Sequence, residues 1–266
     1  MNGRAEEVLA GGAENRGAVV RVGDTVRRPQ KPFSFAVHLL LQHLEAVGFE
    51  GAPRFLGIDD AGREVLDYIP GETVTATVPA WARRARTADS VARLLRDYHR
   101  AVSSFRWPSA TPWDSSVEPP WAGGGLLCHN DPVRSNIVCR GGLAVALIDF
   151  DRAAPALPEW EIACAVRQWI PLRGEEDEHD PESAGQRTAA RIRRFCDVYG
   201  LEGGSRLRVL DAIRDSEAAS RVMLERRAAE GHPAYVRFLR EGAADRIEAR
   251  RLWLDRHAEA LRDAMV

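Results

Sequence analysis

The sequence contains almost no lysine and has no excess of charge of either sign. Lys31 is the only lysine among 37 lysine and arginine residues, and together these nearly balance 39 aspartate and glutamate residues. A balanced charge gives no general attraction to nucleic acid or to anionic lipid. We therefore expect neither a nucleic acid nor a membrane surface as a partner.

The sequence is also poor in cysteine and has no long apolar run. Its four cysteines form no CxxC pair and no cysteine and histidine cluster with the spacing of a zinc site, so we expect buried, reduced thiols. The first residues lack the apolar segment of a signal peptide, and no stretch approaches the ~18 apolar residues that span a bilayer. These absences favour a cytoplasmic protein without a membrane segment.

The first part of the chain predicts a small antiparallel β-sheet with one helix. Short β-branched segments alternate with turns rich in Gly, Asn and Asp, which is typical of a β-meander. A helix interrupts them, because Phe33, Val37, Leu40 and Leu44 recur at helical spacing before a stop at Gly48. We expect five strands, within residues 6–10, 18–22, 25–29, 53–59 and 63–69.

The chain after this sheet predicts mainly helices. An apolar stripe runs through residues 87–105, and Thr87 is available to cap the start of that helix. We therefore predict an α+β fold of two lobes, a β-rich lobe at residues 1–70 and a larger helical lobe at residues 71–266, with a hinge near residues 68–71. Further helices are expected at residues 161–170, 183–200, 205–230 and 244–265.

The segment "CHNDPVRSN" carries the pattern His-x-Asp-x4-Asn, and "LIDFD" follows it. Asp149 lies 18 residues after Asp131 and ends an apolar segment. Phosphoryl transfer needs a carboxylate that orients a hydroxyl and accepts its proton, and this spacing provides one in Asp131. It also needs hard oxygen ligands for Mg²⁺, and Asn136 and Asp149 provide an amide oxygen and a carboxylate. The pattern predicts a catalytic base beside a magnesium site.

The sequence resembles the aminoglycoside phosphotransferase family, which comprises small-molecule kinases related in fold to protein kinases. The segments "GGAENRG", "VRRP", "VLDYIPGE", "HNDPVRSN" and "IDFD" occur in the family's order. The resemblance implies a bilobal protein-kinase-like fold, ATP or GTP bound between the lobes with Mg²⁺, and transfer of the γ-phosphate to a hydroxyl of a small molecule. That acceptor would be an aminoglycoside or another antibiotic or secondary metabolite.

The resemblance also implies where the nucleotide binds. The hinge residues Asp67, Tyr68 and Ile69 are expected to contact it. The turn "GGAENRG" has two interpretations, a simple hairpin connection or a loop that lets Gly11, Gly12 and Gly17 bring backbone N–H groups close to the phosphates.

The sequence departs from the family at the expected lysine and glutamate. Strand alternation places Arg28 where the family has a phosphate-binding lysine, ahead of Lys31, which lies between two prolines. An arginine can hold phosphate oxygens in a bidentate manner. The helix position of the glutamate falls near Val37 and His38, so the ion pair is expected to be missing or remodelled.

Four further polar residues lie in or near these motifs. Three of them have two interpretations each, and the fourth has one. His129 and Asp151 either belong to the site or only satisfy backbone groups at a tight turn. Arg134 either stabilises the transferred charge or points to solvent. Glu161, in "LPEWEIACA", is expected to brace the catalytic loop.

Residues 174–183, "GEEDEHDPES", form an acidic run that is either a solvated loop or a lid favouring cationic acceptors. Two functions therefore stay open. The first is an active small-molecule O-phosphotransferase. The alternative is a catalytically degraded kinase-fold binding or immunity protein, which binds a ligand or partner without phosphoryl transfer.

Overall fold

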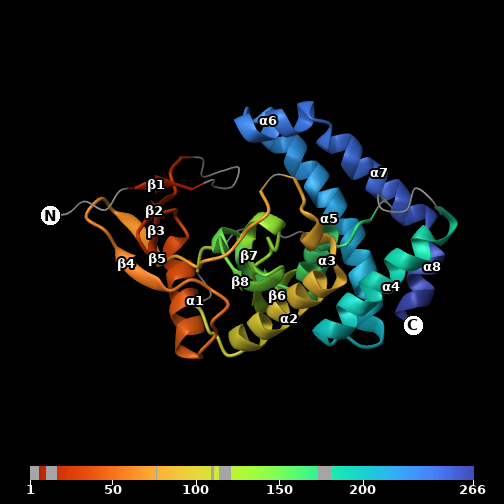
Figure 1. The fold of residues 1–266 in the computed structure, drawn as a ribbon, viewed down its shortest axis with the longest axis horizontal. Coiled ribbons are helices and arrows are strands. Elements are labelled where there is room, and N and C mark those ends of the chain that lie inside the picture. The colour runs from red at the N-terminus through yellow and green to blue at the C-terminus, as the bar shows by residue number, and fades with distance from the viewer. Residues whose placement is uncertain (1–5, 10–16, 76, 109–110, 114–120, 173–180) are drawn as a thin grey trace.

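The computed structural model describes residues 6–9, 17–75, 77–108, 111–113, 121–172 and 181–266, and Figure 1 shows their arrangement. Strands gather at the N-terminal end of the molecule, and long helices form the other end (Figure 1). No helix among the described residues is long and apolar enough to cross a membrane.

The N-terminal sheet has five antiparallel strands in the order β1-β2-β3-β5-β4, which confirms the predicted five-stranded sheet and, in its first three strands, the meander. The register places Arg28 of β3 directly opposite Glu64 of β5. The strands are β1 (Glu7–Val8), β2 (Val20–Val22), β3 (Thr25–Pro29), β4 (Phe55–Ile58) and β5 (Arg63–Asp67).

Helix α1 (Ser34–Ala46) is the single helix predicted within this sheet region. Leu40, Leu41 and Leu44 are buried at the spacing of one helix face, and His38 is buried with them. The helix joins the central core, and His43 Nε2 lies 3.0 Å from the carbonyl oxygen of Ala101 in α2 (Ala85–Val102). The sheet region and the helical region therefore share packing contacts, and a division at residue 70 stays a prediction.

Two short two-stranded sheets flank the segments "HNDPVRSN" and "IDFD" between the two regions. Strand β6 (Ala122–Cys128) pairs with β9 (Ala154–Ala156), and β7 (Ile137–Arg140) pairs with β8 (Leu143–Leu147). Three short 3-10 turns complete this region: η1 (Ala80–Arg83), η2 (Arg134–Asn136) and η3 (Phe150–Arg152).

The remaining helices pack as a group around α5, which is the longest (Figure 1). Their cores combine the apolar faces of several helices, with Trp169, Phe195 and Ile213 fully or nearly fully buried. They are α3 (Pro158–Trp169), α4 (Pro181–Tyr199), α5 (Gly204–Ala229), α6 (Pro233–Arg240), α7 (Ala243–Arg256) and α8 (Ala258–Met265).

Three local predictions were wrong or incomplete. The helix predicted at residues 244–265 is two helices, α7 and α8, which meet at His257. The His257 ring lies so close to Gly185 of α4 that a Cβ at Gly185 would lie 2.4 Å from His257 Cδ2, and the break lets α8 pack on α4.

Helix α6 was not predicted. Thr87 is not the N-cap, because its hydroxyl lies inside the first turn and donates to carbonyl oxygens of Trp81 and Gly142.

Candidate functional site

The turn after β6 holds Asp131 next to Asn136. The Asn136 side-chain amide donates to Asp131 Oδ2 at 2.9 Å and to the Asp131 carbonyl oxygen at 3.2 Å. Turn η2 brings Asn136 back towards Asp131 over five residues, as the spacing predicted. Two of the predicted site residues are therefore joined by direct hydrogen bonds.

His129 ties this turn to the strand that leads to Asp149. Its Nε2 donates to the carbonyl oxygen of Ile148 at 2.9 Å, and the Asp131 backbone N–H donates to its Nδ1 at 3.3 Å. The ring is fully buried against Phe150. His129 thus has a structural role, which was one of its two interpretations. It holds the turn that carries Asp131 beside the end of the strand that precedes Asp149.

Asp149 follows in a left-handed backbone conformation, with φ of 64°. A non-glycine residue adopts this conformation rarely, and it turns the carboxylate into the space between the strands. Burial raises the pKa of Asp149, and the negative charge of Asp151 raises it further, while Arg28 opposes both effects. The positive charge of Arg28 therefore does not fully offset the burial of Asp149 and the negative charge beside it.

Arg28 contacts three carboxylates, one from β5 and two from the turn that contains η3. Its Nη1 lies 2.8 Å from Asp149 Oδ1, its Nη2 lies 2.9 Å from Asp151 Oδ1, and its Nε lies 2.7 Å from Glu64 Oε1. The Nε pair is an ion pair without the geometry of a hydrogen bond. Burial opposes the charge, but the three carboxylates raise the pKa of Arg28 above its ordinary value. Arg28, rather than Lys31, occupies the position opposite Asp149.

Glu64 is a site residue that the sequence reasoning missed. It is almost fully buried on β5, and His38 Nε2 of α1 lies 2.8 Å from its Oε2. The His38 ring stacks on Phe55 at 3.8 Å between centroids, which holds it in place. The expected ion pair is therefore remodelled: the glutamate comes from a strand, and the helix contributes a histidine. The available signal was a glutamate in the same alternating register as the buried Leu66.

Lys31 lies on the other side of Asp151. Its Nζ is 2.5 Å from Asp151 Oδ2. Arg28 and Lys31 together lower the pKa of Asp151 despite its burial. Asp151 therefore does more than complete a turn. It contacts both Arg28 and Lys31, the two candidates for the phosphate-binding cation.

A cavity of about 340 Å³ lies between the N-terminal sheet and the β7-β8 pair. The predicted site residues Arg28, Asn136 and Asp149 line this cavity. The hinge residues Asp67, Tyr68 and Ile69 line it as well. Apolar side chains form much of the wall, namely Leu9, Val19, Val26, Pro53, Leu66, Val138 and Ile148. A flat heterocycle fits such apolar walls, and the polar end offers charge for phosphates.

The glycine-rich turn is only partly described. Gly17 has a positive φ of 76° and does not line this cavity, although Leu9 and Val19 on either side of the turn do. Gly11 and Gly12 lie outside the described residues. Their contact with phosphates stays a prediction.

A second cavity of about 670 Å³ opens on the other side of Asp131. Asp131 and Asp151 lie at the end nearest the first cavity, and helices α3 and α5 form the far walls. Asn136 and Asp149 thus border one cavity and Asp131 the other, while hydrogen bonds connect Asp131 with Asn136.

Arg134 lies in turn η2 together with Asn136, and its guanidinium carbon lies 6.0 Å from the centre of the Trp169 ring. Its action on the transferred charge stays a prediction. The acidic run at residues 174–183 lies almost wholly outside the described residues, so its two interpretations remain as the sequence left them.

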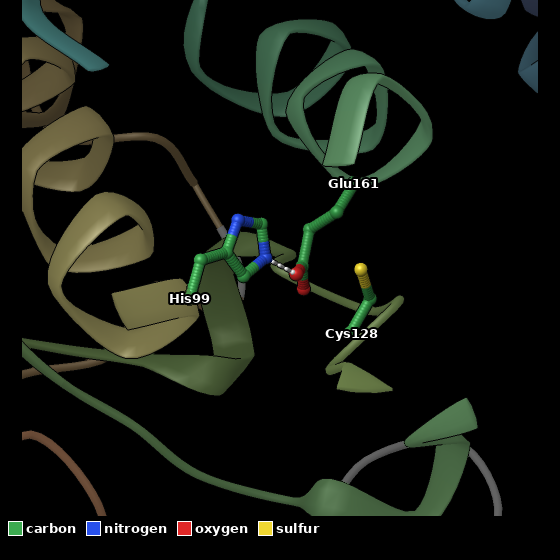
Figure 2. Close-up of side chains that lie close together, drawn as sticks. All are labelled: His99, Cys128 and Glu161. Atoms are coloured by element: carbon green, nitrogen blue, oxygen red, sulfur yellow. Dashed lines mark hydrogen bonds and ion pairs between the residues drawn. The ribbon is translucent and has the colours of Figure 1, made fainter. Parts of the chain in front are cut away.

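Glu161 of α3 braces the loop, as predicted. Its Oε1 accepts the Asn130 backbone N–H at 2.9 Å, and its Oε2 is hydrogen-bonded to His99 of α2 (Figure 2). His99 Nδ1 lies 2.6 Å from the Tyr199 hydroxyl on α4. Burial would raise the pKa of Glu161, but His99 holds it below its usual range. Three helices thus fix the backbone one residue before Asp131.

Cys128 lies beside His99 and Glu161, as Figure 2 shows, and the three offer ligand atoms within 4.8 Å of one another. They do not form a promising metal centre. Burial and the neighbouring carboxylate raise the pKa of Cys128 well above its usual value, so the thiol keeps its proton. Both oxygens of Glu161 are already engaged in hydrogen bonds. The cluster is a structural support of the loop.

The chain is similar to a known protein family and to a known protein. The model of the family described as "Phosphotransferase enzyme family" matches residues 112–210. A relative, the trifolitoxin immunity protein of Rhizobium leguminosarum bv. trifolii, is 35% identical over an alignment of 219 residues that covers 78% of this chain and 79% of the relative.

Solved structures of kinases share the fold across nearly the whole chain. A choline/ethanolamine kinase family protein from Mesorhizobium loti has a TM-score of 0.60 at 19% identity, covering 97% of this chain and 92% of that chain. An amicoumacin kinase in complex with AMP-PNP, Ca²⁺ and Ami has a TM-score of 0.63 at 10% identity, covering 94% and 88%. At these identities the likeness establishes the bilobal fold.

Proposed function

The chain belongs to the phosphotransferase enzyme family, and from that premise we propose that it transfers the γ-phosphate of ATP or GTP to a hydroxyl of a small molecule. One observation carries the proposal: two cavities border one short polar group, with Asn136 and Asp149 lining one and Asp131 the other, and Asn136 donates a hydrogen bond to Asp131. A nucleotide in the first cavity and an acceptor in the second would have their reacting ends at this group.

Asp131 is the proposed catalytic base. The acceptor oxygen forms a bond to the γ-phosphorus, the bond between that phosphorus and the β,γ-bridging oxygen breaks, and the nucleoside diphosphate leaves. Asp131 accepts the hydroxyl proton. The Asn136 amide, which donates to Asp131 Oδ2, orients the carboxylate for this task.

Asn136 and Asp149 are the proposed ligands of Mg²⁺. The donor set fits the ion, because an amide oxygen and a carboxylate are hard oxygen ligands. The raised pKa of Asp149 fits as well, since a buried carboxylate beside Asp151 is stabilised by added positive charge. Bound Mg²⁺ supplies neutralisation of the phosphate charge.

Arg28 is the proposed phosphate-binding cation. A guanidinium can contact two phosphate oxygens while its remaining donors stay with Glu64 and Asp151. Glu64 and His38 position Arg28 and do not themselves contact the reacting atoms. The hinge residues Asp67, Tyr68 and Ile69 are proposed to contact the nucleobase. The glycines Gly11, Gly12 and Gly17 are proposed to contact the phosphates.

The proposal is tested by nucleotide binding and by transfer. We expect Mg²⁺-dependent binding of ATP or GTP by titration calorimetry, and its loss in Asp149→Ala. Incubation with labelled nucleotide and a panel of hydroxyl compounds, including aminoglycosides, nucleosides and peptide antibiotics, should transfer the label. Absence of both nucleotide binding and transfer would refute the proposal.

A second function is favoured by one observation, the identity of 35% with a relative named as an immunity protein. In that case the chain binds a ligand or partner without phosphoryl transfer. The contact between Arg28 and Asp149 is compatible with it, because the cation occupies a carboxylate oxygen that the metal would need. A thermal-shift titration separates the two, since Mg²⁺-nucleotide at ~100 times its dissociation constant stabilises by about 2.7 kcal/mol. No shift would favour the second function.

A further inference from the structure

The large cavity beside Asp131 has one wall built from a single face of α5. Ser216, Ser220, Met223, Arg227 and Glu230 recur along it at helical spacing. Helix α3 forms the adjacent wall with the side chains of Trp160, Cys164, Arg167 and Gln168. The cavity thus combines apolar surface with hydroxyl, amide and charged groups.

Among the described residues that line this cavity, cationic side chains outnumber acidic ones. Three are acidic, namely Asp131, Asp151 and Glu230. Five are cationic, namely Lys31, Arg152, Arg167, Arg226 and Arg227. Each carboxylate has cationic neighbours: Asp151 contacts Arg28 and Lys31, Asp131 lies 3.9 Å from Arg152, and Glu230 lies within 4.0 Å of both Arg226 and Arg227. Because two arginines share Glu230, the described walls away from the reacting end carry more positive than negative charge.

Arg167 contributes to this charge from within a buried cluster. Arg167 Nε lies 2.9 Å from Glu217 Oε1, and Arg250 of α7 contacts the same carboxylate through Nε at 2.6 Å and Nη2 at 2.8 Å. The two guanidinium groups hold the pKa of Glu217 below its usual range despite its burial. Two cations share one carboxylate, so one positive charge in this cluster is uncompensated.

The two arginines of the cluster differ in where they lie. Arg167 lines the cavity, and its side chain is only 11% exposed. Arg250 is not among the lining residues of that cavity. A guanidinium that is largely removed from water and carries unused donors is a strong site for an oxyanion.

A second arginine lies between this cluster and the reacting end. Arg152 Nε is 3.9 Å from Asp131 Oδ2, and its Nη2 lies 3.3 Å from Met223 Sδ and 3.5 Å from the Tyr235 hydroxyl of α6. It therefore lies beside the position of the acceptor hydroxyl. The positive charge extends from the base towards Arg167 along the cavity.

We infer that the acceptor carries an oxyanion, a carboxylate or a phosphate ester, which binds to Arg167 while its hydroxyl lies at Asp131. The inference rests on the proposed function for the role of Asp131, and it differs from the cationic acceptor that the acidic run at residues 174–183 suggested. Arg167 sets specificity, and Arg152 neutralises charge next to the base.

The test uses a matched pair of variants. Arg167→Gln and Arg250→Gln each leave Glu217 with one arginine partner, but only the first removes a cation from the cavity. The probes share one skeleton: glycerate, glycerol 3-phosphate, glyceramide and 3-amino-1,2-propanediol. Binding is measured by calorimetry without nucleotide, and unfolding midpoints of both variants show that they fold.

We expect glycerate or glycerol 3-phosphate to bind more tightly than the neutral and amine probes. Arg167→Gln should weaken that binding by roughly 10-fold or more, because a hydrogen bond to a charged group is lost. Arg250→Gln removes charge from the cluster but no contact with the anion, so it should weaken binding by less, at most about 3-fold. The preferred anion separates a carboxylate from a phosphate ester.

The inference is overturned when the anionic probes bind no more tightly than the others, or when both variants lose the same affinity. Failure of the proposed function is a separate result, because it is a loss of nucleotide binding and of transfer, and neither enters the probe titration.

Discussion

At the scale of single residues, Arg28 is the most consequential departure from the resembled family. Glu64 faces it across the sheet, and His38 contacts Glu64 from α1. The sequence placed Arg28 correctly on the cavity side of its strand, because alternation in a strand is a local property. It did not give Glu64, because the pairing of β3 with β5 is a long-range contact.

Removing the charge of Glu64 should disturb Arg28. In Glu64→Gln we expect kcat/KM for the nucleotide to fall roughly 10-fold, because Arg28 loses a buried partner and is drawn to Asp149 and Asp151. Glu6→Gln is the control, since Glu6 also pairs with an arginine of the sheet but is half exposed. Arg28→Lys combined with Glu64→Gln should be non-additive in steady-state kinetics. Additive losses would show that Glu64 does not position Arg28.

At the scale of elements, the loop before Asp131 depends on α2, α3 and α4 through Glu161. The sequence predicted this brace from the resemblance, whereas His99 and Tyr199 could not be assigned from spacing. They lie about one hundred residues apart in the chain but in hydrogen-bond contact. Local periodicity gives the helices, and their mutual packing decides which polar faces meet.

Glu161→Ala should be strongly destabilising. Each buried donor left without an acceptor costs roughly 1–3 kcal/mol, and the variant leaves two, the His99 ring and the Asn130 N–H. Glu225→Ala is the matched control, since its pair with Arg221 is exposed and worth at most about 1 kcal/mol. Urea unfolding of both variants measures the difference. Equal losses would contradict a bracing role.

The hinge approaches the β7 strand closely at Gly71. A Cβ there would lie 2.4 Å from Val138 Cγ1 and 2.7 Å from the Cys139 carbonyl oxygen. Gly71→Ala should therefore cost about 1–3 kcal/mol and weaken nucleotide binding, because Val138 lines the smaller cavity. Gly204→Ala, with no atom within 4 Å of the added Cβ, is the control. Calorimetry would contradict the account if both variants bound nucleotide equally.

At the scale of the whole molecule, two buried glutamates link stability to pH. Glu161 and Glu217 both have a pKa below the ordinary 4.5 in the folded protein. A lowered folded pKa gives stability that is fully present above 4.5 and is lost as the pH falls through the folded pKa. The contribution of these two glutamates to the free energy of unfolding should thus be constant above this value and decrease below it.

Urea titrations between about pH 6 and about pH 3 measure this dependence. Glu217→Gln should reduce the slope in the acid range, since one of the two linked groups is gone. A free energy of unfolding that stays constant throughout this range would contradict the assignment of buried, ionised glutamates.

The bilobal fold was predictable from the motifs, but the arrangement of its last helices was not. The order of strands and of the Asp131, Asn136 and Asp149 motif gave the bilobal fold and the residues that meet in space. Helix α6 and the break at His257 depend on packing against Arg152 and Gly185, which no local pattern contains. The charge of the acceptor cavity comes from these same helices, so the sequence could not give it.

The central claim is that Asp131 is the catalytic base in phosphate transfer from a bound nucleotide to an acceptor hydroxyl. Its most direct test is the loss of the γ-phosphate from labelled Mg²⁺-ATP and Mg²⁺-GTP in the presence of the acceptor panel, compared between the protein and Asp131→Asn. The account predicts loss of the label by the protein and a rate lower by ~10² or more in Asp131→Asn, with nucleotide binding retained. Equal rates in the two proteins would contradict it.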